Sequence, residues 1–278
     1  MNAGSLLRCL GLALFALAAQ AACAAISCTI SSPGVTMAYP ANTAPVSTQT
    51  SFTVTCARNL ASDPTSISYT VAADNGLNPN GTNNRAFSGA NALKYDVYRD
   101  AACSSTWKGP QTIADSITTL SGFTPVSKTT AFWGCVVTAQ SPSAGTYTDT
   151  VTMTLTYGTS TAVNTFPVSI ATPATCSVTT APGPVAFGTY VALGSAVNAS
   201  ASFAVTCTNY LPYTMSLDAG SGVIVGLRYT LALDAASSTG TGAAQTHSIT
   251  GNLAAGQAGT CSAATCSGSQ TRTLTITY

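Results

Sequence analysis

Two nearly identical hexapeptides, SFTVTC at 51–56 and SFAVTC at 202–207, show that this chain repeats a unit of structure. Each follows an earlier cysteine, Cys28 or Cys176, after a connection rich in Pro, Gly, Asn and Ala. Apolar and polar side chains alternate in both hexapeptides, which is the period of a half-buried β-strand. The duplication constrains the fold strongly, because both copies must bury the same faces of the same strands.

Other segments of the unit also occur twice and in the same order. The further pairs are 66–76 with 213–222, 93–102 with 228–236, 132–140 with 248–257, and 145–157 with 268–278. Alternating segments that end in turn signals predict about six strands in each unit. Short strands at such spacing favour two immunoglobulin-like β-sandwich domains. We expect an N-terminal domain over residues 25–172 and a C-terminal domain over 173–278.

Composition agrees with an all-β fold. Charged residues make up 6% of the chain, against about 25% in ordinary soluble domains. There is no Glu, and Thr, Val, Ser and Gly are abundant, which disfavours helices. The net charge of +1 gives no electrostatic reason to expect binding to nucleic acid or to an anionic membrane.

The first 24 residues have the pattern of a secretory signal peptide. Arg8 supplies a positive charge, residues 10–19 are apolar, and Ala22-Cys23-Ala24 fits a cleavage site between small residues. No later segment is long and apolar enough to span a membrane. The sequence therefore predicts a secreted protein, with the exact cleavage position left open.

Cysteine usage also indicates an oxidising compartment. Two of the ten cysteines fall in the signal peptide, and the eight others are Cys28, Cys56, Cys103, Cys135, Cys176, Cys207, Cys261 and Cys266. An even number in a secreted chain favours disulfides. A zinc site would need closely spaced pairs with partners nearby, and His247 is the only histidine. The repeat suggests the pairs Cys28–Cys56, Cys176–Cys207, Cys103–Cys135 and Cys261–Cys266, although sequence alone does not fix connectivity.

The two units differ after their last shared strand. Segment 145–157 is succeeded by 158–172, whose alternation allows a seventh strand, with Pro167 acceptable at a sheet edge. The second copy ends at Tyr278. We therefore expect the C-terminal domain to lack its last strand and to leave a groove lined by Leu274, Ile276 and Tyr278. Because an unpaired strand edge is costly when buried and prone to aggregation when exposed, we expect a strand from another chain to fill this groove.

Several of these segments together resemble the spore coat protein U family, the pilin subunits of archaic chaperone–usher pili. The resemblance rests on FGTY at 187–190, the two hexapeptides, Leu-Asp-Ala-Gly at 217–220 and GTYTDTVTMTLTY at 145–157. It covers about residues 26–157 and 174–278, although CSGSQTR replaces part of the terminal motif in the second copy. It implies an incomplete sandwich that a periplasmic chaperone and then the adjacent pilin subunit complete, with an outer-membrane usher for export. It implies no cofactor.

The N-terminal side predicts a place in the fibre. After cleavage near Ala24, only residues 25–27 would precede Cys28. A donor segment needs about ten residues to run along a groove, since a strand rises ~3.3 Å per residue. We therefore expect a tip subunit that accepts a strand and donates none. It would pass through the periplasm to the extracellular pilus tip and mediate surface attachment and biofilm formation.

Insertions in the first domain supply candidates for adhesion. The family resemblance implies that apolar loop ends contact hydrophobic surfaces, and exposed apolar patches do mark interaction sites. The candidates are Trp107, Ile113, Leu120 and Phe123. Packing over the end of the sandwich is the alternative for each, because aromatic and aliphatic side chains are so often buried.

Catalytic groups are scarce, so we expect no enzyme activity. Asp96 and Asp100 could share a face, as a glycosidase pair would, but nothing around them supports a sugar-cleaving site. His247 has no Ser–Asp constellation that the sequence can show. Two alternatives to a tip adhesin stay open: a secreted binding protein that folds alone, carbohydrate-binding proteins among them, and an ordinary pilus shaft subunit.

Overall fold

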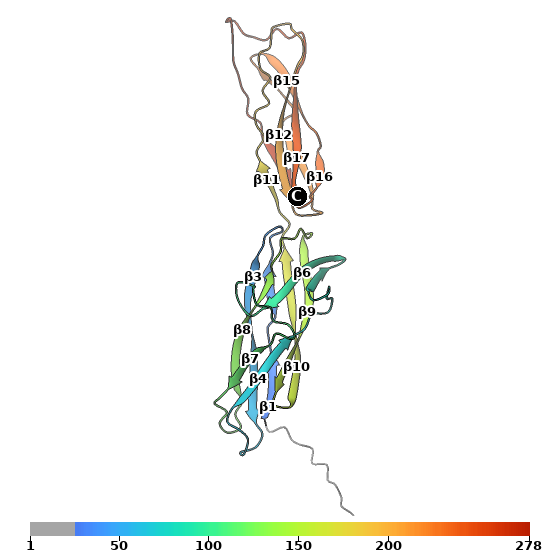
Figure 1. The fold of residues 1–278 in the computed structure, drawn as a ribbon. Helices are drawn as coiled ribbons and strands as arrows, with labels where there is room; N and C mark the ends of the chain where they lie inside the picture. The colour runs from blue at the N-terminus through green and yellow to red at the C-terminus, as the bar shows by residue number, and fades with distance from the viewer. Residues whose placement is uncertain (1–25) are drawn as a thin grey trace, which may run out of the picture.

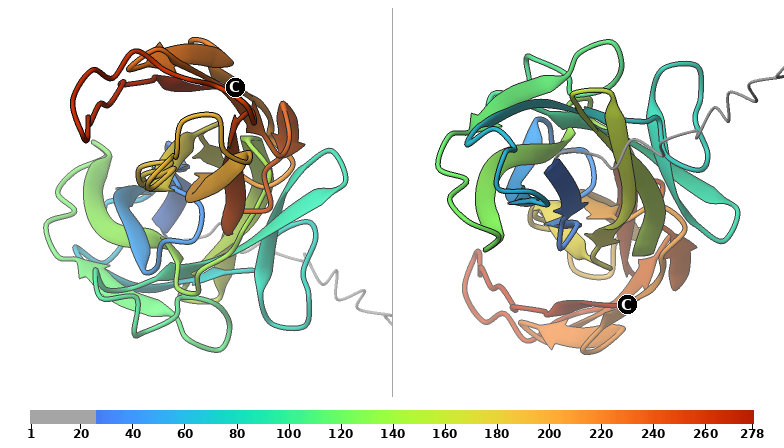
Figure 2. Two further views of the ribbon diagram at one scale, coloured as in Figure 1. Left: turned by 90° about the horizontal axis from the view of Figure 1, so that it is seen from above. Right: turned by 90° about the horizontal axis from the view of Figure 1, so that it is seen from below.

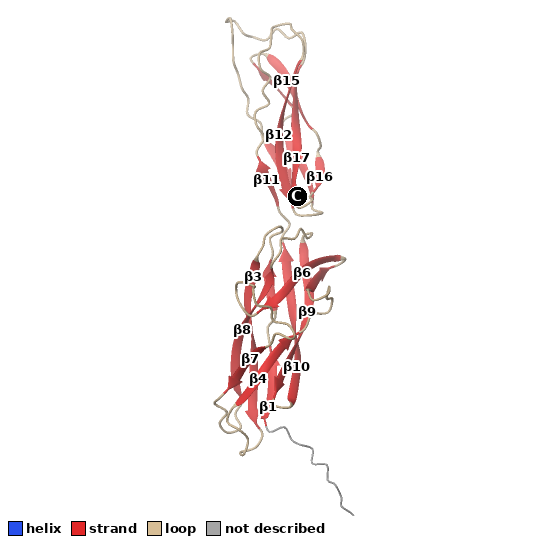
Figure 3. Ribbon diagram, viewed as in Figure 1, coloured by secondary structure: helices blue, strands red, loops and turns tan. Residues whose placement is uncertain are grey.

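The computed structural model describes residues 26–278, which form two β-domains arranged end to end (Figure 1). Strands and loops account for all the described residues (Figure 3), which confirms the all-β prediction. Within them there is no helix long and apolar enough to cross a membrane. The expected signal peptide, residues 1–24, lies outside the described part of the chain.

The first domain contains more strands than the repeat predicts. Its strands are β1 (Ile26–Ser31), β2 (Val35–Ala38), β3 (Val46–Arg58), β4 (Ile67–Ala73), β5 (Asn84–Ser88), β6 (Asn91–Tyr98), β7 (Ile113–Ile117), β8 (Val126–Val136), β9 (Gly145–Tyr157) and β10 (Ser160–Thr172). The strands β5 and β7 lie in segments where the two copies share no sequence pattern, which is why the repeat does not predict them.

The strands of the first domain follow the hydrogen-bonded order β1-β3-β8-β6-β5-β9-β10-β2, in which β6 joins the two sheets, and β4 pairs with β9 and with β7. The chain changes sheets between β1 and β2: β1 pairs antiparallel with β3, whereas β2 pairs in parallel with β10. The strand β10 also pairs along its whole length with β9, from Ser160↔Tyr157 to Thr172↔Gly145. It is thus the last strand that closes this sandwich.

The core of the first domain is large and mostly apolar. It contains 28 buried residues in one cluster, enough to close the sandwich on all sides. Trp107 lies at its centre, with ring centroids 5.2 Å from Phe52 and 4.7 Å from Phe132. Phe166 of β10 extends the aromatic group at 5.3 Å from Phe132. The closing strand therefore contributes directly to the core.

The second domain repeats the plan with fewer strands. These are β11 (Cys176–Thr180), β12 (Val197–Cys207), β13 (Pro212–Leu217), β14 (Ser221–Ile224), β15 (Leu227–Leu233), β16 (Ser237–Thr239), β17 (Ala244–Leu253) and β18 (Leu274–Thr277). One sheet has the order β11-β12-β17-β15-β14 and the other the order β16-β13-β18. Figure 2 views the molecule along its long axis, with the second domain coloured from yellow to red.

Four disulfides link the eight cysteines of the described residues. Cys28–Cys56 and Cys176–Cys207 join the first strand to the second in each domain, at Cα separations of 4.1 Å. Cys103–Cys135 belongs to the first domain and Cys261–Cys266 to the second. This is the pairing that the repeat suggests, since equivalent cysteines face each other across equivalent strand pairs.

Candidate functional site

The outer edge of β18 has no strand beside it among the described residues. Its only partner there is β13, through Met215↔Ile276 and Leu217↔Leu274. The equivalent strand β9 lies between β4 and β10. The inner neighbours, β13 and β4, are both antiparallel. The strand β9 also pairs with β5 at Phe87↔Thr148 and, on its outer side, with β10. An edge of unpaired backbone donors and acceptors on this side can accept another strand.

The opposite wall of this edge is the segment 181–190. Its counterpart in the first domain is β2, which pairs with β10. Glycines at equivalent positions of β8 and β17 let the two segments approach closely. A Cβ on Gly134 would lie 2.4 Å from Val35, and one on Gly251 would lie 2.6 Å from Val185. Segment 181–190 thus occupies the place of β2 without forming a strand.

Apolar side chains between these two walls are only partly covered. The buried cluster of the second domain has six residues, with nine half-buried apolar residues packed against it, so much of its core stays accessible. Leu274 and Ile276 are half-buried, whereas Met153 and Leu155, at the same places in β9, are fully buried. Tyr278 is 58% exposed. The sequence predicts a groove beside Leu274, Ile276 and Tyr278, and these three residues lie along this region.

Behind the groove, His247 joins the two sheets of the second domain. Its Nε2 lies 2.8 Å from the Tyr213 hydroxyl, and its Nδ1 lies 3.4 Å from Oδ2 of Asp234. The ring also packs against Phe203, with centroids 5.6 Å apart. At the equivalent place in the first domain Thr130 lies near the corresponding tyrosine. The imidazole therefore fills a structural position between strands, with no nucleophile beside it.

Just before β18, the sequence departs from that of β9 at Arg272. It stands where β9 has Val151, and its Nε donates to the Tyr229 hydroxyl at 2.8 Å. Its guanidinium also donates to the carbonyl of Ser221 at 2.6 Å. These bonds hold the end of an exposed loop that contains the disulfide Cys261–Cys266. The open edge of β18 is therefore short, and the hydrogen bonds of Arg272 hold the chain just before its first residue, Leu274.

Two of the four adhesion candidates are core residues, which corrects the expectation that they are exposed. Trp107 is 0% exposed because its ring stacks in the aromatic core and its Nε1 donates to the carbonyl of Val71 at 2.8 Å. Leu120 is 1% exposed, and its backbone N–H donates to the carbonyl of Thr65 at 2.9 Å. Both residues anchor loops from the inside.

The other two candidates lie in different surroundings. Ile113 is half-buried in β7, where it pairs with Val71 and packs against the core. Phe123 is 61% exposed in the loop between β7 and β8. The loop between β3 and β4 lies at the same end of the domain, because Cys56 pairs with Val126, and it presents Leu60 at 53% exposure. This pair of exposed apolar side chains faces away from the second domain.

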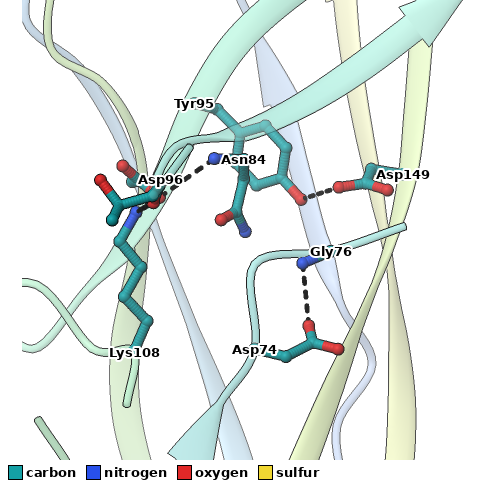
Figure 4. A network of polar contacts seen from close by, with 8 residues as sticks. Asp74, Gly76, Asn84, Tyr95, Asp96, Lys108 and Asp149 are labelled. Atoms are coloured by element: carbon teal, nitrogen blue, oxygen red, sulfur yellow. Dashed lines mark hydrogen bonds and ion pairs between the residues drawn. The ribbon is translucent and has the colours of Figure 1, made fainter. Parts of the chain in front are cut away.

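A polar network lies beneath the β5–β6 hairpin (Figure 4). Asp149 accepts a hydrogen bond from the Tyr95 hydroxyl at 2.7 Å and another from the backbone of Leu77 at 3.0 Å. Burial raises the pKa of Tyr95 above its ordinary value, and the hydrogen bond to Asp149 raises it further. Gly76 is required beside this carboxylate, because a Cβ there would lie 2.1 Å from Asp149 Oδ2.

The remaining carboxylates of this region also serve the fold. Asp96 forms a buried ion pair with Lys108. Burial is the main influence on its carboxyl and raises the pKa, although the hydrogen bond and charge of Lys108 act in the opposite direction. Asp100 instead accepts hydrogen bonds from Ser104 and Ser105 in the next turn, which lowers its pKa. The two carboxylates therefore hold separate local structures and form no acid–base pair.

Sequence reasoning missed the wall at 181–190 and the close approach of Gly251. The signal was present in the aligned segments 132–140 and 248–257, where Gly134 and Gly251 occupy the same place. A glycine inside a strand indicates that another part of the backbone approaches closely. What approaches it is a contact between distant segments, which the alignment of a repeat does not reveal.

Comparisons with known proteins agree with this architecture. The model of the Spore Coat Protein U domain family matches residues 13–154 and 162–277. The chain belongs to this family. The second match begins inside β10, so the family unit treats the closing strand of the first domain as the start of the second copy. A comparison with curated protein sequences found no match.

Among solved structures, the chain is similar to one in the CsuC-CsuE chaperone–tip adhesion subunit pre-assembly complex from archaic Csu pili of Acinetobacter baumannii. The identity is 14% over 91% of this chain and 100% of that chain, with a TM-score of 0.49. The CupB6 tip adhesin from Pseudomonas aeruginosa is 10% identical over 91% of this chain and 95% of that one, with a TM-score of 0.41. With these identities and TM-scores below 0.5, the two similarities support no inference about this chain.

Proposed function

We propose that this spore coat protein U protein is the tip subunit of an archaic chaperone–usher pilus, which accepts a donor strand and attaches the pilus to a surface. One observation carries the proposal: no strand of residues 26–278 covers the outer edge of β18, whereas β10 covers the same edge of β9. A periplasmic chaperone and then the adjacent pilin subunit would supply the missing strand, and an outer-membrane usher would export the chain to the cell surface.

The first domain provides a template for the missing strand. In β10 the inward-facing Phe166, Val168 and Ile170 are buried, and the strand runs antiparallel to β9 and parallel to β2. A donor strand in the second domain should accordingly run antiparallel to β18 and parallel to segment 181–190. It should carry large apolar side chains at every second position, because those side chains fill the space between the sheets.

Adding the chain's own closing strand tests the proposal. Tyr157 and Tyr278 are equivalent, so a copy of residues 158–172 can be joined directly after Tyr278 in the register of β10. The added strand should stabilise the second domain by at least about 4 kcal/mol, since each buried large apolar side chain contributes about 1.5–3 kcal/mol. Urea denaturation, followed by hydrogen exchange at β13 and β18, measures the effect.

A matched control carries Phe166→Asp and Val168→Asp in the added copy alone. It has the same length and turn, but charged side chains would face the core, so it should give no stabilisation. If the unmodified chain and both fusions unfold at the same urea concentration, the second domain is complete by itself. That result would favour the secreted binding protein that folds alone.

Position at the tip is supported by the state of the first domain. Its groove is already occupied by β10 of the same chain, and Ile26 already pairs with Arg58 in β1. The segment on which a donor role would depend, residues 1–25, lies outside the described residues. A domain closed in this way can stand at the end of a fibre with its far loops free for contact.

Adhesion is assigned to the loop ends that carry Phe123 and Leu60. Both side chains are more than half exposed at the end of the first domain away from the second, and exposed apolar side chains favour contact with hydrophobic surfaces. Changing Phe123→Ser and Leu60→Ser together should reduce attachment to polystyrene and early biofilm formation while the secreted amount stays unchanged.

The control for adhesion is Trp107→Ala, which should lower secretion instead. It removes a fully buried ring, and such truncations cost about 3–5 kcal/mol of stability. If the Phe123→Ser and Leu60→Ser variant attaches as well as the unmodified protein at equal surface amounts, the adhesive surface lies elsewhere.

A further inference from the structure

The same corner of hydrogen bonds is built in both domains around a glutamine. In the first domain the Gln140 side chain accepts from Lys94 N at 2.9 Å and donates to Lys94 O at 2.8 Å, and its backbone N–H donates to the Tyr39 hydroxyl at 2.8 Å. Its carbonyl accepts from Asn42 N at 2.8 Å. Asn42 has a φ of +61°, so the corner projects this residue from the end of the domain.

In the second domain the glutamine of this corner is Gln257. Its side chain accepts from Arg228 N at 2.7 Å and donates to Arg228 O at 2.9 Å, and its backbone N–H donates to the Tyr190 hydroxyl at 3.0 Å. Its carbonyl accepts from Leu193 N at 2.8 Å, and Leu193 has a φ of +59°. Leu193 therefore occupies the position that Asn42 has in the first domain.

The corner of the first domain is already an interface. The Asn42 side chain donates to the carbonyl of Gly242 in the second domain. Beside it, the Asn209 side chain donates to the carbonyl of Ser141 at 2.9 Å, and Ser143 forms a bridge with Asn209. This end of the first domain thus supports the base of the second domain, as the meeting of the two bodies in Figure 1 illustrates.

The position of the second domain on this end of the first domain is set by β10, the strand that closes the first domain. The strand β10 ends at Thr172, and residues 173–175 lead directly into β11. Thr208 holds this connection, because its hydroxyl donates to the carbonyl of Pro173 at 3.0 Å and its N–H to the carbonyl of Thr175 at 2.9 Å. Because β10 closes the first domain and leads directly into β11, it places the second domain against the hydrogen-bonded corner around Gln140.

The corner of the second domain is free and apolar. Val191 and Leu193 are 72% and 71% exposed, and they stand where the first domain has Pro40 and Asn42. Exposed, adjacent apolar side chains at a position that elsewhere forms an interface indicate a contact surface.

We propose that Val191 and Leu193 form the seat for the body of the subunit that donates the missing strand. The inference rests on the proposed function, since a donor strand in the place of β10 would end at this corner. The occupant is a β-sandwich domain joined to its donor strand by a short connection, as the second domain is joined to β10. The change from Asn42 to Leu193 gives this outer seat an apolar contact, whereas the internal one is polar.

Two extensions of the full chain distinguish the effect of the donor strand alone from the effect of the domain that follows it. The first adds a copy of residues 158–172 after Tyr278. The second adds a copy of 158–278 and then a further copy of 158–172 to close the last groove, so it supplies both a strand and a body with the base loops that meet Asn42. Each carries Val191→Cys in the original copy, and the rate of reaction with a water-soluble maleimide is measured.

The thiol should react equally fast in the unextended chain and in the strand-only extension. It should react at least about tenfold more slowly when the body is present, because a covered thiol reacts only through local opening. Leu60→Cys, at the opposite end of the molecule, should react at one rate in all three proteins. In the second extension, adding Leu193→Asp to the original copy should restore fast reaction at Val191→Cys, since a charge opposes an apolar contact.

If the maleimide reaction of Val191→Cys is as fast with the added domain as without it, Val191 and Leu193 do not form a contact surface for that domain. The same conclusion follows if the reaction stays slow after Leu193→Asp. Failure of the proposed function gives a different result: the strand-only extension would then leave the urea stability of the second domain unchanged.

Discussion

Several charged side chains in this protein are buried together with a partner. The Asp96–Lys108 ion pair has side chains that are 10% and 11% exposed, and Asp149 accepts from Tyr95 in the same network. A buried charge that loses its partner typically costs about 3–5 kcal/mol, whereas an apolar replacement of both partners is often neutral. This network therefore holds the β5–β6 hairpin in position. Changing only one of its charged members should destabilise the first domain.

Lys108→Met should destabilise the first domain by about 3–5 kcal/mol at neutral pH. Burial already holds the pKa of Asp96 above its ordinary value, and loss of the lysine raises it further. A raised folded-state pKa means that stability falls as pH rises from the unfolded-state value through the folded-state value. The defect should therefore be smaller near pH 4 than at pH 7 in urea denaturation. A defect of equal size at both pH values would show that Asp96 stays paired by another group.

The double variant Asp96→Leu and Lys108→Met is the matched control for this effect. Because both charges are removed together, it should recover most of the lost stability at pH 7 and show little pH dependence of its own.

Among the elements, the most informative comparison is between β2 and segment 181–190. The same place in the plan is a strand when β10 lies beside it and a loop when the neighbour is absent. Backbone groups pair when a partner is available. Among the described residues, the edge of β18 and segment 181–190 both lack the neighbouring strand that β9 and β2 have in β10.

Gly251→Val should prevent the second domain from accepting a strand. Its side chain would collide with Val185 and with Phe187, where a Cβ already comes within 2.7 Å, and would push the wall away from β17. In the fusion that adds residues 158–172 after Tyr278, most of the gain in urea stability should therefore disappear. If the gain persists, segment 181–190 does not form the second wall of the groove.

At the scale of the whole molecule, two domains are joined by a closing strand, a short connection and a small set of polar contacts. The asparagines Asn42 and Asn209 each donate across the junction. Contacts of this kind are worth about 0.5–1.5 kcal/mol each, too little to stabilise either domain but enough to restrict their relative orientation.

Changing Asn42→Ala and Asn209→Ala together should loosen the junction without unfolding either domain. Small-angle X-ray scattering should then show a broader range of inter-domain distances, while urea denaturation of both domains stays within about 0.5 kcal/mol of the unmodified protein, as is usual for surface changes. A large loss of stability would mean that the junction is part of a shared core.

The amino-acid sequence was enough to predict most of the strands, their duplication and the cysteine pairs. Each of these comes from a period of two or from the comparison of one copy with the other, which are local or repeated signals. It could not decide that Trp107 and Leu120 are buried while Phe123 is exposed. Residues in loops have no period, so their burial depends on which distant segments meet them.

Tertiary contacts alone established how the two copies are connected. The strand β10 closes the first domain while leading into the second, and Gln140 and Gln257 build the same corner with different residues on top. These features arise from contacts between segments far apart in the chain. Side-chain alternation along one strand records which face is buried, but not which strand or domain lies against it.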